Sequence, residues 1–359
     1  MQKNKVLLYG ANGYTGKLIV QLATPYHLPI VLAGRNEAAL QAISRSSGYA
    51  CRVVALNNPL LLQQCLEDVA VVIHAAGPFA HTAREMVEAC LATGTHYLDI
   101  NGDVSMFEFV QRYNEAAMQK NIMLLPGAGF DVVPTDCLAL QLKQQLPDAH
   151  QLELAFITQG GRISHGTATT MVSKLGRGGA ERKNGQIVSV PLGKHALWLE
   201  TNQKKRLVLS IPWGDVSTAW YTTGIPNIRT YTGATPLTYR LLQAQGFINP
   251  LLRTSFVRQL IQRKIDAAPA GPSDAERELA YTYVWGRVRN AGNEMVTASF
   301  RCADGYTFTA HSCLLLAQAV LQGNWKPGFQ TPARVYGADM VWKVPGTVAE
   351  NIRLLKECL

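Results

Sequence analysis

The segment "LLYGANGYTG" (residues 7–16) is an apolar run that stops at a glycine and continues with two more glycines, each three residues further on. The apolar run predicts a buried strand, and a helical pattern begins at about residue 14. A strand-to-helix turn with so few side chains allows another molecule to approach the main chain closely. Gly10, Gly13 and Gly16 therefore raise the question of which molecule this is.

The context of this turn is a regular alternation of short β-rich runs and helical patterns, which extends to about residue 127. Strands that are apolar throughout are typical of a parallel sheet with helices on both faces. The pattern predicts an α/β fold, a Rossmann-type doubly wound parallel sheet. The β-rich runs are "KVLLYG" (5–10), "PIVLAG" (29–34), "CRVVAL" (51–56), "VAVVIHAAG" (69–77), "HYLDI" (96–100) and "IMLLPG" (122–127).

In this context the glycines indicate a dinucleotide. The missing Cβ atoms make room for a pyrophosphate, whose charge is stabilised by free N–H groups and by the positive end of the following helix. A tight turn without a ligand would also use three glycines, but the βαβ series around them favours the cofactor. The residues expected to bind it at this turn are Gly10, Ala11, Asn12, Gly13, Tyr14, Thr15 and Gly16.

The end of the second run decides which dinucleotide is expected. An NAD site would carry Asp or Glu there, to bind the ribose 2′-hydroxyl. This run ends "LAGRN" (32–36), and the first carboxylate, Glu37, comes one position later. The Arg35 guanidinium is suited to a 2′-phosphate, so the sequence predicts NADP(H), with Arg35 and Asn36 in the site. The alternative is a surface arginine near a helix start.

The fourth run ends "HAAGPF" (74–79), at the edge of the sheet where ligands bind in open α/β folds. The small residues Ala76 and Gly77, with Pro78 after them, are expected to border the cofactor. His74 lies inside the apolar run, and we expect it to be a core residue.

Beyond Pro126 the pattern changes to longer, alternating stretches, which predict half-buried antiparallel strands and hence a second, α+β domain. Ser273 or Asp274 is suited to cap the helix that follows a Pro/Gly loop. The alternating stretches are "QLELAFIT" (151–158), "RLVLSIPW" (206–213) and "EMVTASFRC" (294–302), with helical patterns at 134–146 and 236–267.

Composition excludes several classes of protein. The net charge is +9, but the densest basic runs, "ERK" (181–183) and "KKR" (204–206), are short and lack interleaved aromatics, so we expect solvated turns and no nucleic-acid partner. The cysteines are odd in number and contain no C-x-x-C pair, which predicts no disulfide framework and no metal site. A signal peptide and a membrane span are not expected, so the predicted location is the cytoplasm.

Together these motifs resemble the saccharopine dehydrogenase-like NADP-binding oxidoreductases, in particular the branch called trans-acting enoyl reductase. The motifs that carry the resemblance follow one another along nearly the whole chain. They are "GANGYTG" (10–16), "LAGRN" (32–36), "AAGPF" (75–79), "GTHYLDINGD" (94–103), "PGAGFDVVPTD" (126–136), "GPSDAERE" (271–278), "DGYTFTA" (304–310) and "GFQTPARVYG" (328–337).

The resemblance implies a domain arrangement and a reaction. Residues 1–127 would form the NADP-binding domain, residues 128–325 an inserted α+β domain for the substrate and for homodimer contacts, and residues 326–359 a segment returning to the first domain. It also implies NADPH-linked reduction or its reverse. One departure is that "YLD" is followed by Asn-Gly-Asp (101–103), where the family usually has Thr-Gly-Glu, so no particular substrate carries over.

The cofactor would supply the hydride, so the protein needs to orient the substrate and to handle one proton. Asp99 follows the fifth run, Asp131 follows the sixth, and His165 in "ISHGTATT" (163–170) is the candidate from the second domain. Each also fits a structural role: Asp99 in a cap, Asp131 at a helix start, and His165 bonded to a loop carbonyl. The hydroxyls of "GTATT" are suited to a polar end of the substrate.

The sequence therefore predicts an NADPH-dependent oxidoreductase that reduces a C=N or C=C bond of a small-molecule substrate, as an imine or enoyl reductase does. Two alternatives stay open. One is a non-catalytic NADP-binding partner or sensor of a biosynthetic enzyme complex, and the other is an epimerase or lyase that retains its cofactor.

Overall fold

The computed structural model describes residues 3–174, 176–201, 204–246, 249 and 254–351. The chain divides into two compact units. The first comprises the residues up to Val133 together with Gly305–Pro345, and the second comprises Pro134–Asp304 together with the residues from Gly346.

The first unit is built on a parallel sheet with the strand order β15-β6-β5-β4-β1-β2-β3. Its central strands are buried along nearly their whole length, as continuous apolar runs require. The predicted doubly wound parallel sheet is therefore confirmed. The strands are β1 (Lys5–Tyr9), β2 (Ile30–Gly34), β3 (Ala50–Val53), β4 (Val69–His74), β5 (His96–Asp99), β6 (Met123–Leu125) and β15 (Gly328–Phe329).

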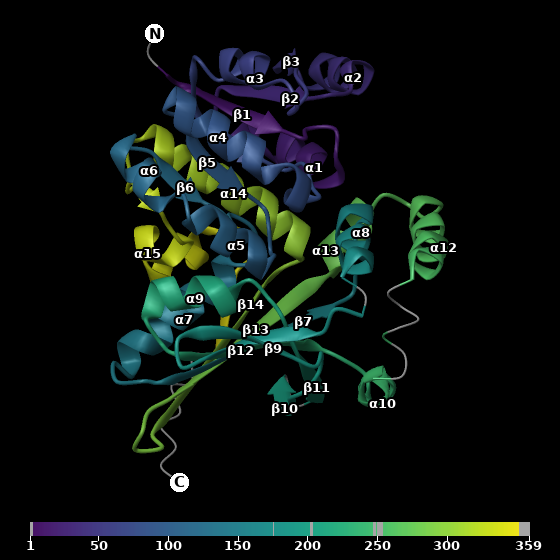
Figure 1. Cartoon of the computed structure of the whole chain (residues 1–359), viewed down its shortest axis with the longest axis vertical. Helices are drawn as coiled ribbons and strands as arrows, with labels where there is room; N and C mark the ends of the chain where they lie inside the picture. Colours follow the sequence, from purple (N-terminus) through teal and green to yellow (C-terminus); the bar gives the residue numbers. More distant parts are fainter. Residues whose placement is uncertain (1–2, 175, 202–203, 247–248, 250–253, 352–359) are drawn as a thin grey trace. The chain divides into compact units, whose positions relative to one another are not determined.

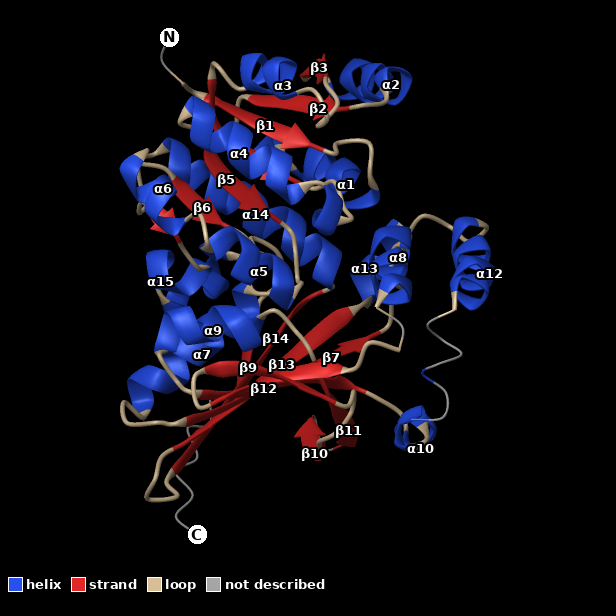
Figure 2. Ribbon diagram, in the orientation of Figure 1, coloured by secondary structure: helices blue, strands red, loops and turns tan. Residues whose placement is uncertain are grey.

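Helices cover both faces of this sheet (Figures 1 and 2). One layer contains the contacting helices α3, α4 and α5, and the other contains α1 packed against α14. The helices of the first unit are α1 (Tyr14–Leu22), α2 (Glu37–Ser47), α3 (Pro59–Cys65), α4 (Ala83–Thr93), α5 (Val104–Gln111), α6 (Asn114–Gln119), α14 (Gly305–Leu321) and α15 (Pro332–Tyr336), with the short helices η1 (Thr24–Tyr26), η2 (Phe79–His81) and η3 (Ala338–Lys343).

The C-terminal part of the chain returns to this sheet, as predicted. Helix α14 contacts β4 and β5, and β15 pairs in parallel with β6. The return begins at Gly305, twenty positions before the predicted boundary at 325, and β16 (Val348–Asn351) pairs with a strand of the second unit. Residues 352–359 of the predicted returning segment lie outside the described residues.

The second unit is built on a mixed sheet with the strand order β10-β11-β12-β7-β13-β14-β16, joined by the hairpin β8–β9. Strand β7 pairs antiparallel with β13 but parallel with β12, so the purely antiparallel arrangement was wrong at this one pair. The strands are β7 (Gln151–Gln159), β8 (Gly179–Lys183), β9 (Gln186–Val190), β10 (Ala196–Thr201), β11 (Lys204–Ile211), β12 (Asn227–Gly233), β13 (Tyr281–Arg289) and β14 (Met295–Ala303).

One face of the mixed sheet is covered by α7 (Val133–Gln145). A Cβ added at Gly286 of β13 would lie 2.7 Å from Leu142 and 3.0 Å from Leu138, so this glycine admits the helix to the sheet. The other helices of the unit are α8 (His165–Ser173), α9 (Asp215–Thr223), α10 (Pro236–Gln243), α12 (Ser255–Asp266) and α13 (Asp274–Leu279). Ser273 begins α13 with a capping box to Glu276, as predicted.

Three local predictions differ from the structure. The run "ERK" lies in β8 and "KKR" in β11, so they are strands and not solvated turns, and Glu181 and Arg182 are both buried. The segment "GTATT" belongs to helix α8, where Ser164 caps the first turn. The helical pattern 236–267 contains two separate helices, α10 and α12, and residues 247–248 and 250–253 lie outside the described residues.

Candidate functional site

The loops that follow β1 and β4 meet main chain to main chain. Gly10 has a φ of +88°, and a Cβ added there would lie 2.8 Å from the nitrogen of Ala76 and 2.9 Å from the carbonyl carbon of Ala75. Parallel pairing of β1 with β4, continued by the hydrogen bond from Ala75 N to Tyr9 O at 2.8 Å, aligns the two loops. The structure thus brings together two loops that were predicted separately.

The glycines after Gly10 leave the start of α1 open. Gly13 is the N-cap residue, and no side chain of the described residues caps this helix. A Cβ added at Gly16 would lie 2.2 Å from Gly10 O and 2.8 Å from Ala11 Cα, so this position has no space for a side chain. The first turn also contains no acidic residue. An exposed helix start of this kind is suited to an anion.

The end of β2 lies beside the same turn. The side-chain oxygen of Asn12 would be 3.4 Å from a Cβ added at Gly34, the last residue of β2. Arg35 follows it, is exposed, and forms no hydrogen bond or ion pair with the described part of the chain. The side-chain oxygen of Asn36 instead caps α2 by accepting a hydrogen bond from Ala39 N at 3.1 Å.

The loop after β4 is fixed by a hydrogen bond from Thr82. Thr82 Oγ1 donates to Ala76 O at 2.7 Å, while Gly77 and Pro78 are exposed at the edge. His74 is fully buried, its Nε2 lies 3.1 Å from Thr82 Oγ1, and burial lowers its pKa to about 3. These contacts agree with the prediction that His74 is a core residue.

Asp99 ends β5 and is fully buried. Its Oδ1 accepts hydrogen bonds from the main-chain N–H groups of Asn101 and Gly127, both at 2.9 Å, and its Oδ2 accepts one from Tyr97 Oη at 2.7 Å. Burial raises the pKa of Asp99 to about 6, although these three donors stabilise the charged form. The carboxyl group therefore fixes the loops after β5 and β6, which is the structural alternative considered for it.

Asp131 lies directly against the loop that follows β5. A Cβ added at Gly102 would be 2.2 Å from Asp131 Oδ2, so only glycine leaves room for this carboxylate. Asp131 is partly exposed, whereas Asn101 beside it is buried with its Nδ2 unpaired. The Asn-Gly-Asp variation in the sequence and the candidate acid Asp131 thus belong to one place.

His165 belongs to the second unit, as the first residue of α8. Its Nε2 lies 2.6 Å from Ala268 O, and its main-chain N–H donates to Ala270 O at 2.9 Å. The imidazole is thus bonded to a loop carbonyl, which was the alternative considered for it. Its role as a catalytic residue stays a prediction.

The charged contacts of the second sheet are not predicted by the sequence. Glu153 on β7 accepts hydrogen bonds from Arg287 Nε at 2.8 Å and from Tyr231 Oη at 2.9 Å. Glu181 on β8 is paired with Arg229 Nε at 2.9 Å. The only signal in the sequence was the alternation of charged and apolar residues along each strand, which identifies a face but not a partner.

A metal site was not expected, and no group of His, Cys, Asp or Glu side chains suited to a metal ion occurs in the described ranges. Among the helices that the structure describes, none is both long enough and apolar enough to span a bilayer.

Comparison with known proteins agrees with the geometry of the first unit. Residues 6–125 match the family model described as the saccharopine dehydrogenase NADP binding domain. A saccharopine dehydrogenase-like oxidoreductase of Mus musculus is 26% identical over 203 residues, which cover 50% of this chain and 47% of that protein. A putative trans-acting enoyl reductase of Mycobacterium tuberculosis is 29% identical over 186 residues, covering 47% and 44%. The chain spans about half the length of these curated relatives.

Solved structures extend the likeness of fold to the whole chain. The saccharopine dehydrogenase (L-Glu forming) of Saccharomyces cerevisiae superposes with a TM-score of 0.65 at 13% identity and covers 95% of this chain and 96% of its own. The homospermidine synthase of Legionella pneumophila, solved with NAD, has a TM-score of 0.62 at 11% identity, with 95% and 89% covered.

The family model matches the part of the chain that contains the glycine turn, whereas the solved structures, at 13% and 11% identity, show the likeness of fold. Residues 6–125 of this chain therefore match the saccharopine dehydrogenase NADP binding domain family, and the first unit is an NAD(P)-binding domain.

Proposed function

We propose that this chain is an NADPH-dependent oxidoreductase that transfers hydride to a C=N or C=C bond of a small metabolite. The observation that carries the proposal is the meeting of the turns after β1, β2 and β4, with bare main chain at Gly10 and Gly16 and the exposed Arg35 beside them. The names of the curated relatives, oxidoreductase and enoyl reductase, support the same reaction class.

The residues of the first unit fit NADP. The uncapped start of α1 suits the pyrophosphate. A Cβ at Gly10 would collide with the loop after β4, and one at Gly16 would collide with main-chain atoms of the turn itself. Arg35 would hold the 2′-phosphate, because β2 ends in Gly34 and is followed by arginine where an NAD site has a carboxylate. When bound, the cofactor supplies the hydride.

The chain's own contribution would be to position groups and to handle a proton. We assign Asp99 a positioning role, because its three hydrogen bonds hold the loops that start at Asn101 and Gly127. Asp131 is the candidate proton carrier of the first unit, since its carboxylate lies at the same loop and is partly exposed. His165 stays a candidate from the second unit.

A titration of the intact protein with NADPH and with NADH tests the cofactor assignment. Arg35→Ala should weaken NADPH binding roughly tenfold to a hundredfold, because hydrogen bonds to a charged group contribute about 1.5–3 kcal/mol, and it should leave NADH binding unchanged. Arg45→Ala is the matched control, since Arg45 lies at the far end of α2 and, among the described residues, its side chain bonds only to Gln41 O. Equal NADPH affinity in the wild type and in Arg35→Ala would contradict the assignment.

A measurement of NADPH turnover distinguishes this function from a second candidate function. A non-catalytic NADP-binding role is favoured by two observations: the Asp99 carboxyl group is fully hydrogen-bonded, and His165 Nε2 is bonded to Ala268 O. If the protein is an enzyme, some unsaturated substrate must consume NADPH, and Asp131→Asn should lower kcat while NADPH affinity is retained. Binding of NADPH without consumption of the cofactor, across imine and enoyl substrates, would favour the second role.

A further inference from the structure

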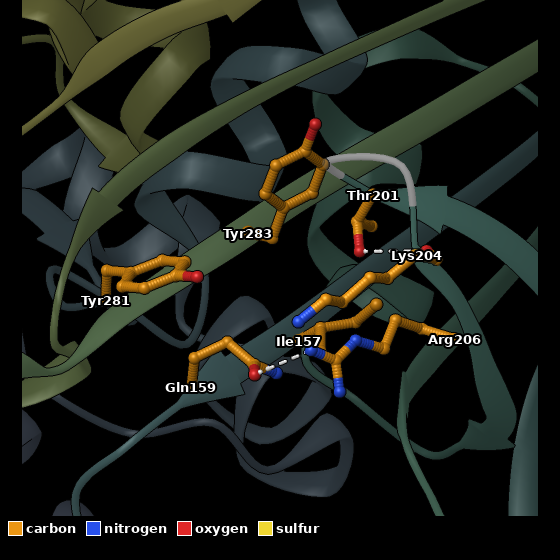
Figure 3. A pocket seen from close by; sticks show the side chains of 7 residues that line it. All are labelled: Ile157, Gln159, Thr201, Lys204, Arg206, Tyr281 and Tyr283. Carbon is orange, nitrogen blue, oxygen red and sulfur yellow. Dashed lines mark hydrogen bonds between the residues drawn. The ribbon is translucent and has the colours of Figure 1, made fainter.

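A pocket of about 210 Å³ lies within the second unit, on the face of the mixed sheet. Its lining comes from β7, β10, β11 and β13, so all of it belongs to one unit (Figure 3). The lining residues are Ile157, Gln159, Thr201, Lys204, Arg206, Tyr281 and Tyr283. One water needs only about 10–15 Å³ of such space, so the pocket has room for a small organic molecule.

The pocket contains two cations on one strand. Lys204 and Arg206 are two positions apart on β11, so their side chains leave the same face of the sheet. Opposite them on β10 stand Thr201 and Leu199, neither of which is acidic. The ammonium of Lys204 has no ion pair or hydrogen bond with the described residues, and Arg206 Nη2 donates to the neutral amide oxygen of Gln159 at 3.0 Å.

Two other cations of this sheet are paired with carboxylates. Arg287 is paired with Glu153, and Arg229 is paired with Glu181. Lys205, between the two pocket cations but on the opposite face, stands across from Glu200. Two adjacent cations without a carboxylate repel each other, and an anion between them would remove that repulsion.

The walls of the pocket are apolar and aromatic. Ile157 and Tyr283 are each only 6% exposed and belong to the hydrophobic core of the sheet. The guanidinium carbon of Arg301 lies over one face of the Tyr281 ring, 5.0 Å from the ring centroid. In Figure 3, the Lys204 ammonium and the Arg206 guanidinium point toward the side lined by Tyr281 and Gln159. A ligand can thus meet positive charge and aromatic surface at the same time.

We propose that this pocket binds a small organic anion, a carboxylate or a phosphate monoester that carries an aromatic or apolar group. The guanidinium of Arg206 suits two oxygens of the anion, and the flexible Lys204 provides a point charge. The ring of Tyr281 and the side chain of Ile157 would contact the apolar part. The residues of this pocket belong entirely to the second unit, whereas those of the dinucleotide turn belong to the first.

Calorimetry on the full-length chain tests the proposal with defined probes. Phenyl phosphate and benzoate cover the two anion types, inorganic phosphate lacks the apolar group, and benzyl alcohol lacks the charge. We expect the better of phenyl phosphate and benzoate to bind at least tenfold more tightly than inorganic phosphate or benzyl alcohol. Equal binding of inorganic phosphate would overturn the organic ligand, and equal binding of benzyl alcohol would overturn the anion.

Variants on the same strand locate the binding. Lys204→Ala and Arg206→Gln should each weaken the preferred probe roughly tenfold, while Lys205→Ala, on the opposite face of β11, should leave it unchanged. If Arg206→Gln does not fold, the affinity of Lys204→Ala tests the proposal, since Lys204 is exposed and its substitution should not disturb folding. The proposal fails if Lys205→Ala loses as much affinity as Lys204→Ala. It also fails if no probe binds and Lys204→Ala changes only the oligomeric state, because the face would then contact a second copy.

Discussion

The two sheets of this protein carry their polar groups in different ways. In the parallel sheet of the first unit, the strand ends expose main chain, and the candidate site is formed by glycines in tight turns. In the mixed sheet of the second unit, charged side chains project from the middle of the strands and pair across them. The first kind of site requires positions at which the backbone leaves no room for a Cβ. The second kind depends on which side chains face one another.

This difference predicts that the first unit is most sensitive to a single methyl group. Gly16→Ala should destabilise the protein by about 3 kcal/mol or more, although alanine is a better helix former than glycine. The reason is that its Cβ would lie 2.2 Å from Gly10 O, a main-chain atom that cannot rotate away. Urea unfolding followed by circular dichroism measures the change.

Gly48→Ala is the control for this prediction. Gly48 has a φ of +77°, but nothing lies within 4 Å of an added Cβ. Only the left-handed backbone conformation opposes alanine there, which costs about 1–2 kcal/mol. Equal destabilisation by the two substitutions would show that the turn after β1 is no tighter than an ordinary helix end.

The second prediction concerns a buried charge in the same unit. The pKa of Asp99 is raised from 3.8 to about 6, so the native protein binds more protons than the unfolded chain between these values. Stability should therefore decrease by about 3 kcal/mol as the pH rises through this window. In Asp99→Asn this contribution to the pH dependence should be absent, because the amide does not titrate. Urea unfolding at about pH 4, 5, 6 and 7 measures it, and the same slope in both proteins would exclude the assignment.

The third prediction addresses the side-chain network of the second unit. Glu153→Gln should destabilise the protein by about 2 kcal/mol, because the carboxylate accepts hydrogen bonds from Arg287 and from Tyr231. Glu200→Gln on the same sheet is the matched control, with an expected change within about 0.5 kcal/mol, since Glu200 is exposed. Chemical unfolding of both variants makes the comparison, and similar values would mean that pairing across the strands adds no stability.

The same contrast explains which features the sequence predicted. The glycine turn, Arg35 at the end of β2 and the Ser273 cap are each defined within a few residues, so local patterns were sufficient. The pairing of Glu153 with Arg287 joins residues 134 positions apart, and neither segment of sequence indicates that the other is its partner. Asp99 had the right position at a strand end, but its burial depends on the packing of β6, which a single run of residues does not reveal.

The wrong prediction for the two basic runs, "ERK" and "KKR", has the same cause: their surroundings depend on strands that are distant in the sequence. Three charges in a row are usually exposed, which predicts a solvated turn for "KKR", yet Lys204 and Arg206 alternate with Lys205 along β11. Alternation assigns the outer two to one face and the middle residue to the other. Which of these faces contains a pocket depends on β7, β10 and β13, and so on the fold.

The smallest expected effect lies at the rim of the first sheet and has the opposite pH dependence to Asp99. The Arg52 guanidinium holds the pKa of Asp68 well below its usual range, with a further contact from Lys5 at 2.8 Å. Asp68→Asn should cost only about 1 kcal/mol, because the three side chains are partly exposed. The contribution of Asp68 is present above its unfolded pKa of about 4 and is lost as the pH falls below it. We therefore expect Asp68→Asn and Asp99→Asn to change the pH dependence of the free energy of unfolding in opposite directions, relative to the wild type, when both are unfolded across one pH series. A change in the same direction would contradict the burial of Asp99 or the pairing of Asp68.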